Sequence, residues 1–408
     1  MSQRWWPSAT SDSVFLSPSA VVGGTGASRR LGSLMFEHLG LRTGSVLLAA
    51  DDAVIEAGLI HPIVEALQTD GFDVHVHSGF GAEPTSDLVD EVAHKARAEN
   101  VRAVIGIGGG SVLDSSKIIA LLLHNKGDAA DWLGSVNPED GVAPLVLLPT
   151  TCGTGAEATR IAMVTVNGHK RVSSCPKYVP RVAVIDPELV KSLPPKVVAA
   201  TGMDALAHAT ESLMSTSASV LSAHHSLRGI EMIVENLEAA YNGDDNSLAA
   251  MLWGAHIAGQ ALNSGVVLGH SLAYSLANAQ PMPHGVSCAI ALPYCIAYNQ
   301  NLEPKLAELL SLTLTRSRSS NLRDAAQEIL ALSARMGLPQ TLADVHLSAS
   351  SIPEMASLCV QDYPRPTNPE PFDEQLIADL FACMETADLE KAFALTKLTP
   401  PIHEGTAR

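Results

Sequence analysis

The chain has 408 residues, of which 46% are hydrophobic and 17% charged, and its net charge at pH 7 is −17. This length allows two domains with a large buried core, and the composition is typical of a globular protein. The acidic balance argues against a nucleic-acid surface and against docking on anionic membranes, because both need clustered Lys and Arg side chains. The six cysteines form no CxxC pair, and no secretory or membrane-spanning pattern is found, so we expect a cytoplasmic protein.

The first half of the chain alternates β-rich runs with helical patterns. The runs VLLAA and PLVLLP are continuously apolar, which indicates strands buried on both faces, as in a parallel sheet. Helical stretches at Leu59–Thr69 and Leu88–Glu99 separate the strands. This alternation predicts a doubly wound α/β domain. The predicted strands are Ser45–Ala50, Phe72–His77, Val101–Ile107, Pro144–Leu148, Ile161–Val166 and Val182–Ile185.

After Pro194 and Pro195 the helical patterns dominate and no convincing strand pattern follows. We therefore place a domain boundary near residue 195, with an α/β domain over residues 1–195 and an all-helical domain over residues 196–408. The tail after about residue 398 is expected to be disordered. The predicted helices are Val197–Met214, Ala218–Tyr241, Leu248–Asn263, His270–Ala279, Leu302–Thr313, Leu322–Met336 and Glu374–Met384.

Two polar loops follow predicted strands of the first half. GIGGGSVLDSSK opens a helix, and its Gly109, Gly110 and Ser111 can bring backbone N–H groups to a pyrophosphate, although a tight turn with a serine cap gives the same pattern. PTTCGTGAEAT follows the strand PLVLLP. Open α/β sheets bind ligands at the carboxyl ends of their strands, so the two loops together predict a nucleotide site. Asp51 ends the first strand, where a carboxylate can bind a ribose 2′-hydroxyl, which favours NAD over NADP, although a surface or helix-capping aspartate would give the same pattern.

Four side chains of the second half are candidates for a metal site. Asp204 and His208 are four residues apart on a predicted helix and therefore project from one face. His270 and His284 come from later segments and would have to fold back to that face. One carboxylate with three imidazoles suits Fe²⁺ or Zn²⁺.

Read in order, six segments resemble the iron-containing (group III) alcohol dehydrogenase family over about residues 20–390: GGGSVLDSSK, PTTCGTGAEAT, DPELVKSLPP, TGMDALAHATES, GHSLAYSLA and PHGVSCAIALP. The resemblance implies a dehydroquinate synthase-like architecture, with the active site between a dinucleotide-binding domain and a helical domain. It implies NAD(H) as the cofactor, with NADP not excluded, Fe²⁺ as the metal, with Zn²⁺ as the alternative, and a homodimer or larger assembly. The implied metal ligands are Asp204, His208, His270 and His284, and the implied cofactor positions are Asp51, Gly109, Gly110, Ser111, Thr150, Thr151, Thr154 and Lys170.

Two residues stand apart from this pattern. Many members of the family have H-x-x-x-H where this chain has His270 and Tyr274. The tyrosine hydroxyl can still take part in proton transfer, or the ring can serve packing alone. Arg160 follows the second polar loop, where its guanidinium could bind a carboxylate, phosphonate or sulfonate of a substrate, or simply lie on the surface.

The predicted reaction is reversible hydride transfer between a nicotinamide cofactor and a small alcohol or aldehyde whose oxygen is polarised by a metal. Three alternatives stay open. A maleylacetate-reductase-like enzyme typically reads PHA, where this chain has PHG at His284. A dehydroquinate-synthase-like lyase would have glutamate in place of Asp204. The last alternative is a nucleotide-binding protein without turnover.

Overall fold

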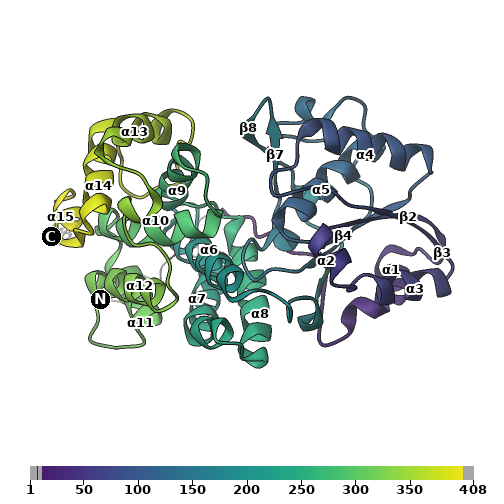
Figure 1. The fold of residues 1–408 in the computed structure, drawn as a ribbon, viewed down its shortest axis with the longest axis horizontal. Coiled ribbons are helices and arrows are strands. Elements are labelled where there is room, and N and C mark those ends of the chain that lie inside the picture. Colours follow the sequence, from purple (N-terminus) through teal and green to yellow (C-terminus); the bar gives the residue numbers. More distant parts are fainter. Residues whose placement is uncertain (1–6, 8–11, 398–408) are drawn as a thin grey trace, which may run out of the picture.

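The computed structural model describes residue 7 and residues 12–397. An α/β half and a helical half lie side by side along the long axis of the molecule (Figure 1). The tail after residue 398, for which we expect disorder, lies outside the described residues.

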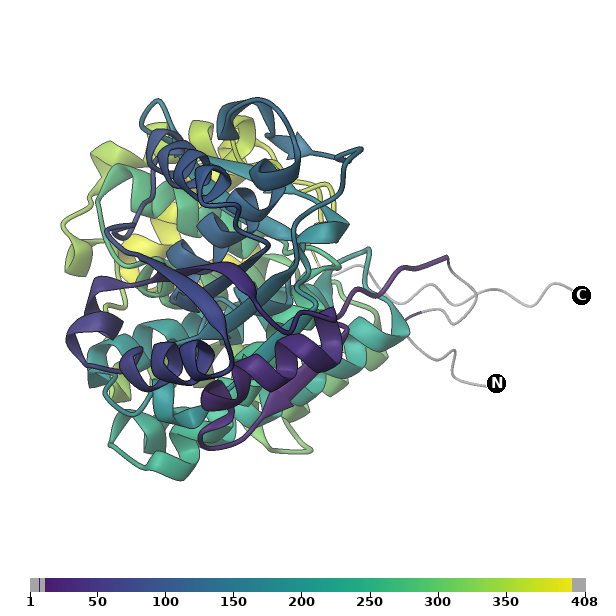
Figure 2. The same cartoon turned by 90° about the vertical axis from the view of Figure 1, so that its right-hand side faces the viewer.

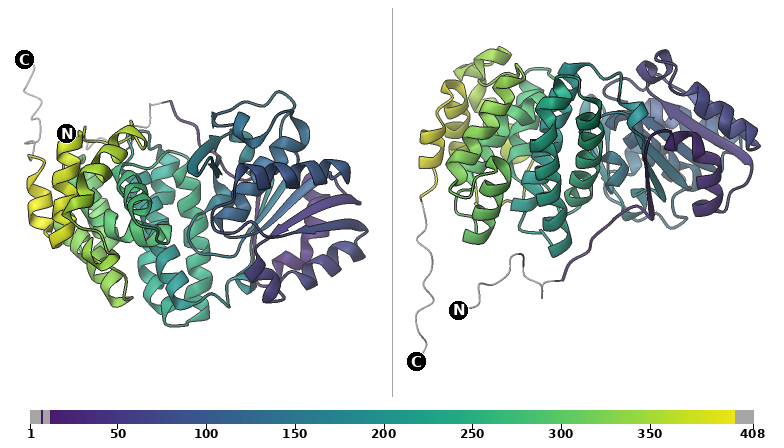
Figure 3. Two further views of the ribbon diagram at one scale, coloured as in Figure 1. Left: turned by 45° about the horizontal axis from the view of Figure 1, so that its top comes forward. Right: turned by 90° about the horizontal axis from the view of Figure 1, so that it is seen from below.

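A six-stranded sheet forms the centre of the α/β half, with strand order β1-β9-β6-β4-β2-β3 and every neighbouring pair parallel. Successive residues of one strand enter opposite cores: Leu47 packs with the helices on one face, whereas Val46 and Leu48 pack with those on the other. Figures 2 and 3 show the strands fanning between the two helical layers. The predicted doubly wound α/β fold is therefore confirmed. The strands are β1 (Ala20–Gly23), β2 (Gly44–Ala50), β3 (Phe72–His77), β4 (Ala103–Gly108), β6 (Leu145–Pro149) and β9 (Val182–Ile185).

The two faces of this sheet are covered by different helices. One core contains α4 and α5, and the other contains α1 and α3. The helix α5 begins at Gly110, directly after β4, so its N-terminus lies at the carboxyl edge of the sheet. The helices of this half are α1 (Leu31–Leu39), α2 (Asp52–Glu56), α3 (His61–Thr69), α4 (Ser86–Ala98) and α5 (Gly110–His124).

One predicted strand lies outside the main sheet. β7 (Ile161–Val166) pairs antiparallel with β8 (His169–Ser174), and β5 (Gly134–Ser135) joins them in a second sheet. The turn consists of Asn167 and Gly168, both with positive φ (51° and 78°), as in a tight hairpin. β8 was not predicted because its sequence, HKRVSS, is polar and mostly exposed. The hairpin lies at the edge of the α/β half that faces the helices (Figure 1).

The helical half is built around α6, which is buried along almost its whole length because its neighbours cover every face. All the helices predicted for this half are found, with small shifts at their ends. The helices α13 and α15 were missed, and so was α10. It is apolar on all sides and contains Pro293, so it shows no helical periodicity.

No described helix is long and apolar enough to cross a membrane. The helices are α6 (Pro195–Met214), α7 (Val220–Tyr241), α8 (Asp245–Leu262), α9 (Leu268–Ala279), α10 (His284–Tyr298), α11 (Pro304–Thr315), α12 (Leu322–Arg335), α13 (Ile352–Gln361), α14 (Glu374–Thr386) and α15 (Leu389–Ala394).

The loop after β6 joins the two halves through α8. Glu157 Oε1 lies 2.9 Å from His256 Nδ1, and both side chains are buried. Gly155 has a φ of 57°, and its backbone lies directly against Gly259. A Cβ on Gly259 would lie 2.5 Å from the carbonyl oxygen of Gly155, so neither backbone can accept a side chain.

We therefore expect Gly259→Ala to lower the free energy of unfolding by about 1–3 kcal/mol, because the overpacked contact must open. Denaturant titration of the purified protein would measure this change. Gly229→Ala on α7 is the matched control, since its Cβ would meet no atom closer than 3.4 Å. The alanine should be neutral or stabilising there. Equal effects of the two exchanges would contradict the close approach.

Candidate metal centre and cofactor cleft

Three acidic or imidazole side chains project from one face of α6. Asp204, His208 and Glu211 are spaced by four and three residues, which places them one above another on the helix. All three are nearly inaccessible to solvent. Because α6 is enclosed by other helices, these polar groups need partners inside the protein.

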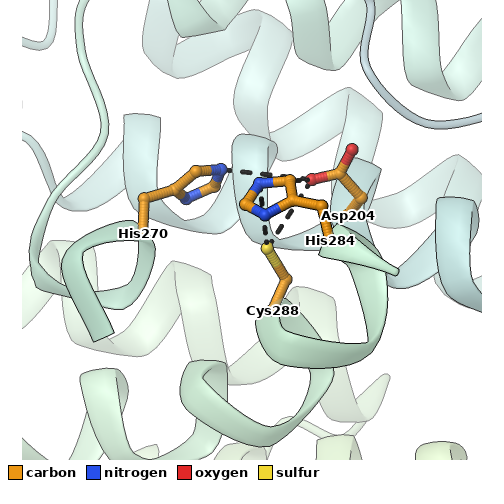
Figure 4. Close-up of side chains that lie close together, drawn as sticks. All are labelled: Asp204, His270, His284 and Cys288. Atoms are coloured by element: carbon orange, nitrogen blue, oxygen red, sulfur yellow. Dashed lines mark hydrogen bonds and ion pairs between the residues drawn. The ribbon is translucent and has the colours of Figure 1, made fainter. Parts of the chain in front are cut away.

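The N-terminal turns of α9 and α10 supply two of these partners. His284 is the first residue of α10 and His270 is the third residue of α9. The Nε2 atoms of His208 and His284 each lie 3.6 Å from Asp204 Oδ1, and that of His270 lies 4.0 Å from it. Figure 4 shows the side chains of Asp204, His270 and His284 pointing toward one another. The structure thus brings together all four residues predicted from the sequence.

The chemistry of this cluster fits a divalent cation. His270 Nε2 is buried without a hydrogen-bond partner, so its lone pair is available at the centre. Burial lowers the pKa of His270 well below its usual value and that of His284 to about 4, so both imidazoles are neutral near pH 7. Neutral imidazoles are the form that binds metals. One carboxylate oxygen and three imidazole nitrogens suit Fe²⁺ or Zn²⁺.

Glu211, which was not predicted, orients His270. Its Oε1 lies 2.7 Å from His270 Nδ1, and its Oε2 accepts the backbone N–H groups of His270 (3.1 Å) and Val267 (3.0 Å). A proton on Nδ1 directs the lone pair of Nε2 toward Asp204. Gly269 permits this arrangement, because a Cβ there would clash with the Glu211 carboxylate. Burial raises the pKa of Glu211 to about 8, although the backbone N–H groups of His270 and Val267 act against this shift. A cation bound at the centre would favour the ionised carboxylate.

Cys288 was also missed. Its Sγ lies 3.6 Å from Asp204 Oδ1 and 3.5 Å from His284 Nε2, one helical turn beyond His284 (Figure 4). The donor atoms of Asp204, His270, His284 and Cys288 all lie within 4.8 Å of one another. A thiol at this place is a further potential ligand for a metal. The spacing of four residues on one helix was the available signal.

A cavity of about 560 Å³ opens above the cluster. Asp204, His208, His270 and His284 line it from the helical half, and the hairpin of β7 and β8 lines it from the α/β half. Of the expected cofactor positions, Thr154 and Lys170 also contribute to its wall. Lys170 Nζ pairs with Glu83 Oε1 at 2.9 Å.

The other expected cofactor positions gather at the carboxyl edge of the sheet. Asp51 Oδ2 accepts the backbone N–H of Gly109 at 2.7 Å. A Cβ on Gly110 would lie 2.8 Å from Thr154 Cγ2, and one on Gly109 would lie 3.5 Å from Thr151 Cγ2, so the two polar loops touch. Thr150 N–H donates to the carbonyl of Gly108, and Ser111 Oγ donates to the carbonyl of Ala82.

Tyr274 lies against two of the candidate ligands. Its ring stacks on His284, with 5.0 Å between centroids and an angle of 11°, and meets His270 edge-on at 6.0 Å. Burial raises the pKa of Tyr274, so the phenol remains protonated and can donate a hydrogen bond near neutral pH. The side chain also lines the cavity.

Arg160, the candidate for an anionic substrate group, lies elsewhere. It is exposed, its backbone N–H donates to Asn263 Oδ1, and it is not among the described residues that line the cavity. The arginines in the cavity wall are Arg171 and Arg365, neither of which was singled out from the sequence.

Comparisons with known proteins agree with this arrangement. The family model "Iron-containing alcohol dehydrogenase" matches residues 18–187, and "Fe-containing alcohol dehydrogenase family, C-terminal" matches residues 198–384. The long-chain-alcohol dehydrogenase 1 of Geobacillus thermodenitrificans is 33% identical over 327 residues, which cover 78% of this chain and 83% of the relative. The chain belongs to the iron-containing alcohol dehydrogenase family.

Two further known proteins are similar to this chain over most of their length. The NAD-dependent methanol dehydrogenase of Bacillus methanolicus is 30% identical, with 90% of this chain and 98% of the relative covered. The crystal structure of a 1,3-propanediol oxidoreductase superposes with a TM-score of 0.85 at 28% identity, covering 91% of this chain and 99% of that chain. The family and the fold implied by the sequence resemblance are thus confirmed. As a member of this family, the protein is an oxidoreductase that acts on alcohols or aldehydes.

Because Glu211 fixes the orientation of His270, we expect Glu211→Gln to weaken metal binding by about 10–100-fold. Competition with a chromophoric chelator would measure the affinity. Glu157→Gln is the matched control, since Glu157 pairs with His256 in the same way but away from the cluster. Unchanged affinity in Glu211→Gln, or an equal loss in the control, would refute the orienting role.

Proposed function

We propose that the protein transfers a hydride reversibly between NAD(H) and a small alcohol or aldehyde at a divalent metal. The observation that carries the proposal is the convergence of Asp204 and three imidazoles on the wall of a cavity that is also lined by Thr154 of the second polar loop. The relatives are named for methanol, 1,3-propanediol and long-chain alcohols, so the family supports the reaction type.

In this proposal Asp204, His208, His270 and His284 hold Fe²⁺, with Zn²⁺ as the alternative. The chemistry that such a cation supplies when bound is polarisation of the substrate oxygen, which favours alkoxide in one direction and hydride acceptance by the carbonyl in the other. Glu211 keeps the Nε2 lone pair of His270 directed at the centre. The apolar helices enclose the ligands on the side away from the cavity, which strengthens the electrostatic interactions among them.

The α/β half would hold the dinucleotide. Gly109, Gly110 and Ser111 present the N-terminus of α5, whose free N–H groups and positive dipole end suit a pyrophosphate. Thr150, Thr151 and Thr154 follow the neighbouring strand and extend this surface toward the cavity. In our proposal the nicotinamide therefore points to the metal centre, with Lys170 on the facing hairpin.

Tyr274 is our candidate for proton transfer at the substrate oxygen. Its hydroxyl belongs to a protonated, half-buried phenol whose ring is held by stacking on His284. A positioned acid of this kind contributes about 100-fold or more to a rate. A ribose hydroxyl of the cofactor or water are the other routes that the cavity allows.

The decisive experiment is reconstitution of the metal-free protein with Fe²⁺ or Zn²⁺ under anaerobic conditions, followed by NADH oxidation with a panel of short aldehydes. We expect turnover that depends on metal, and we expect Asp204→Ala to lose both metal and activity. Tyr274→Phe should retain the metal and lose about 100-fold in kcat. NADH binding without turnover would instead identify a non-catalytic nucleotide-binding protein. An unchanged kcat in Tyr274→Phe would show that the tyrosine serves packing and not proton transfer.

A preference for NAD over NADP follows from Asp51 in the same proposal. Its carboxylate would accept a hydrogen bond from a ribose 2′-hydroxyl and repel a 2′-phosphate. Asp51→Asn keeps an acceptor for the Gly109 N–H while removing the charge. We expect this exchange to raise the ratio of kcat/KM for NADPH to that for NADH by about 10-fold or more, because a full repulsive charge is lost.

Steady-state kinetics with both coenzymes would test this expectation. Asp52→Asn removes the neighbouring exposed carboxylate, which accepts the N–H of Gly79, and serves as the matched control. A similar change of coenzyme preference in both variants would show that net charge, rather than contact with the ribose, is responsible.

A further inference from the structure

Arg365 lies in the wall of the cavity and takes part in no salt bridge found among the described residues, although its charge opposes the upward shift in the pKa of the buried Glu211. Its Nε is buried and has no hydrogen-bond partner, and a 3.3 Å contact to the carbonyl of the preceding Pro364 is the one hydrogen bond found for Nη1. No carboxylate within the described residues lies within 4.0 Å of its guanidinium. The side chain is only half-buried, and an oxyanion on its accessible side would give the remaining N–H groups of the guanidinium an acceptor.

The guanidinium lies one aromatic ring away from the metal ligands. Its central carbon is 5.7 Å from the centre of the Tyr274 ring, which stacks on His284. This cation–π contact accounts for part of the stabilisation, but it leaves Nη2, for which no hydrogen bond is found in the described part of the chain, open to a ligand. A substrate oxygen at the metal centre and a second group at Arg365 would therefore belong to one short molecule.

The segment around Arg365 is held firmly against α9. Ser271 Oγ donates to the carbonyl of Tyr363, and Thr367 Oγ1 donates to the carbonyl of Val266 at 2.8 Å. Asn368 Oδ1 accepts the backbone N–H of Leu268 at 3.0 Å. The guanidinium is thus presented by a pinned backbone, which reduces the entropy lost when it binds a ligand.

The remaining charges of the cavity leave it receptive to an anion. Asp114 is paired with Lys117, and Lys170 is paired with Glu83. Asp204 belongs to the metal cluster, and Asp362 is exposed at the rim. Arg171, which is exposed on the facing hairpin, adds a second positive charge to that of Arg365.

We propose that Arg365 binds the anionic group of the substrate, and that the preferred substrates are short oxo acids, that is, aldehydes carrying a carboxylate, phosphonate or sulfonate. The planar guanidinium can hold such an oxyanion through two parallel hydrogen bonds. The assignment rests on the proposed hydride transfer, and it replaces Arg160 by Arg365 as the residue that recognises the anion.

The first test compares kcat/KM for oxo acids of two to five carbons with that for their methyl esters. We expect the wild-type protein to prefer the acids, and Arg365→Ala to lose about 10–100-fold on the acids while changing little on the esters. Arg365→Lys should recover part of the lost kcat/KM on the acids, because lysine keeps the positive charge but lacks the two parallel N–H donors of the guanidinium. Parallel assays with phosphonate and sulfonate analogues identify the favoured oxyanion.

Arg318→Ala is the matched control, because it removes one exposed arginine from a distant loop and changes the net charge equally. Arg160→Ala tests the location that the sequence alone suggested. A preference of the wild-type protein for the esters, an equal loss on acids and esters in Arg365→Ala, or a selective loss in Arg160→Ala would each overturn the assignment to Arg365.

A binding measurement separates this inference from the proposed reaction. Calorimetric titration of the NAD-loaded protein with succinate, which cannot be reduced, should give a dissociation constant that rises about 10-fold or more in Arg365→Ala but not in Arg318→Ala. Such binding without any aldehyde turnover would refute the hydride transfer and keep the anion site. Turnover of neutral aldehydes, with succinate binding unchanged in Arg365→Ala, would refute the anion site and keep the hydride transfer.

Discussion

The burial of a carboxylate inside the helical half is the constraint on which the rest of the structure depends. Asp204 is enclosed on α6, where an uncompensated charge would cost several kcal/mol, and three imidazoles surround it. The N-termini of α9 and α10 must approach α6 closely to deliver two of them. A Cβ on Gly285 would overlap the carbonyl of Ala200, and one on Gly269 would meet Glu211, so glycine makes both approaches possible.

The loop after β6 connects this centre with the expected cofactor site. Thr151 faces Gly109 of the phosphate loop, Thr154 lines the cavity, and Glu157 pairs with His256 on α8. One short segment therefore contacts the sheet edge, the cavity and the helical half. Any displacement of one half against the other would act on both sites through it.

The features of the fold and the site that could be predicted are those whose sequence signal lies in residues close together along the chain. Asp204 and His208 share a helical face, so their spacing in the sequence already indicated a shared direction. For the distant His270 and His284 the resemblance to a family supported their assignment to the same site. The strand β8 and the helix α10 were missed because a polar edge strand and a uniformly apolar helix lack the periodicity on which such predictions rest. Glu211 was missed for another reason: its role depends on contacts with backbone N–H groups in a different helix.

The sequence by itself determined the doubly wound α/β fold, the helical second half and the family, because apolar periodicity and collinear motifs are properties of the chain order. The tertiary structure alone decided which cations face the cavity. Arg160 follows a predicted cofactor loop yet points elsewhere, whereas Arg365, more than 200 residues later, lies beside Tyr274. The side-chain direction in an irregular segment depends on the partners that pin its backbone, and for Arg365 those partners lie on and just before α9.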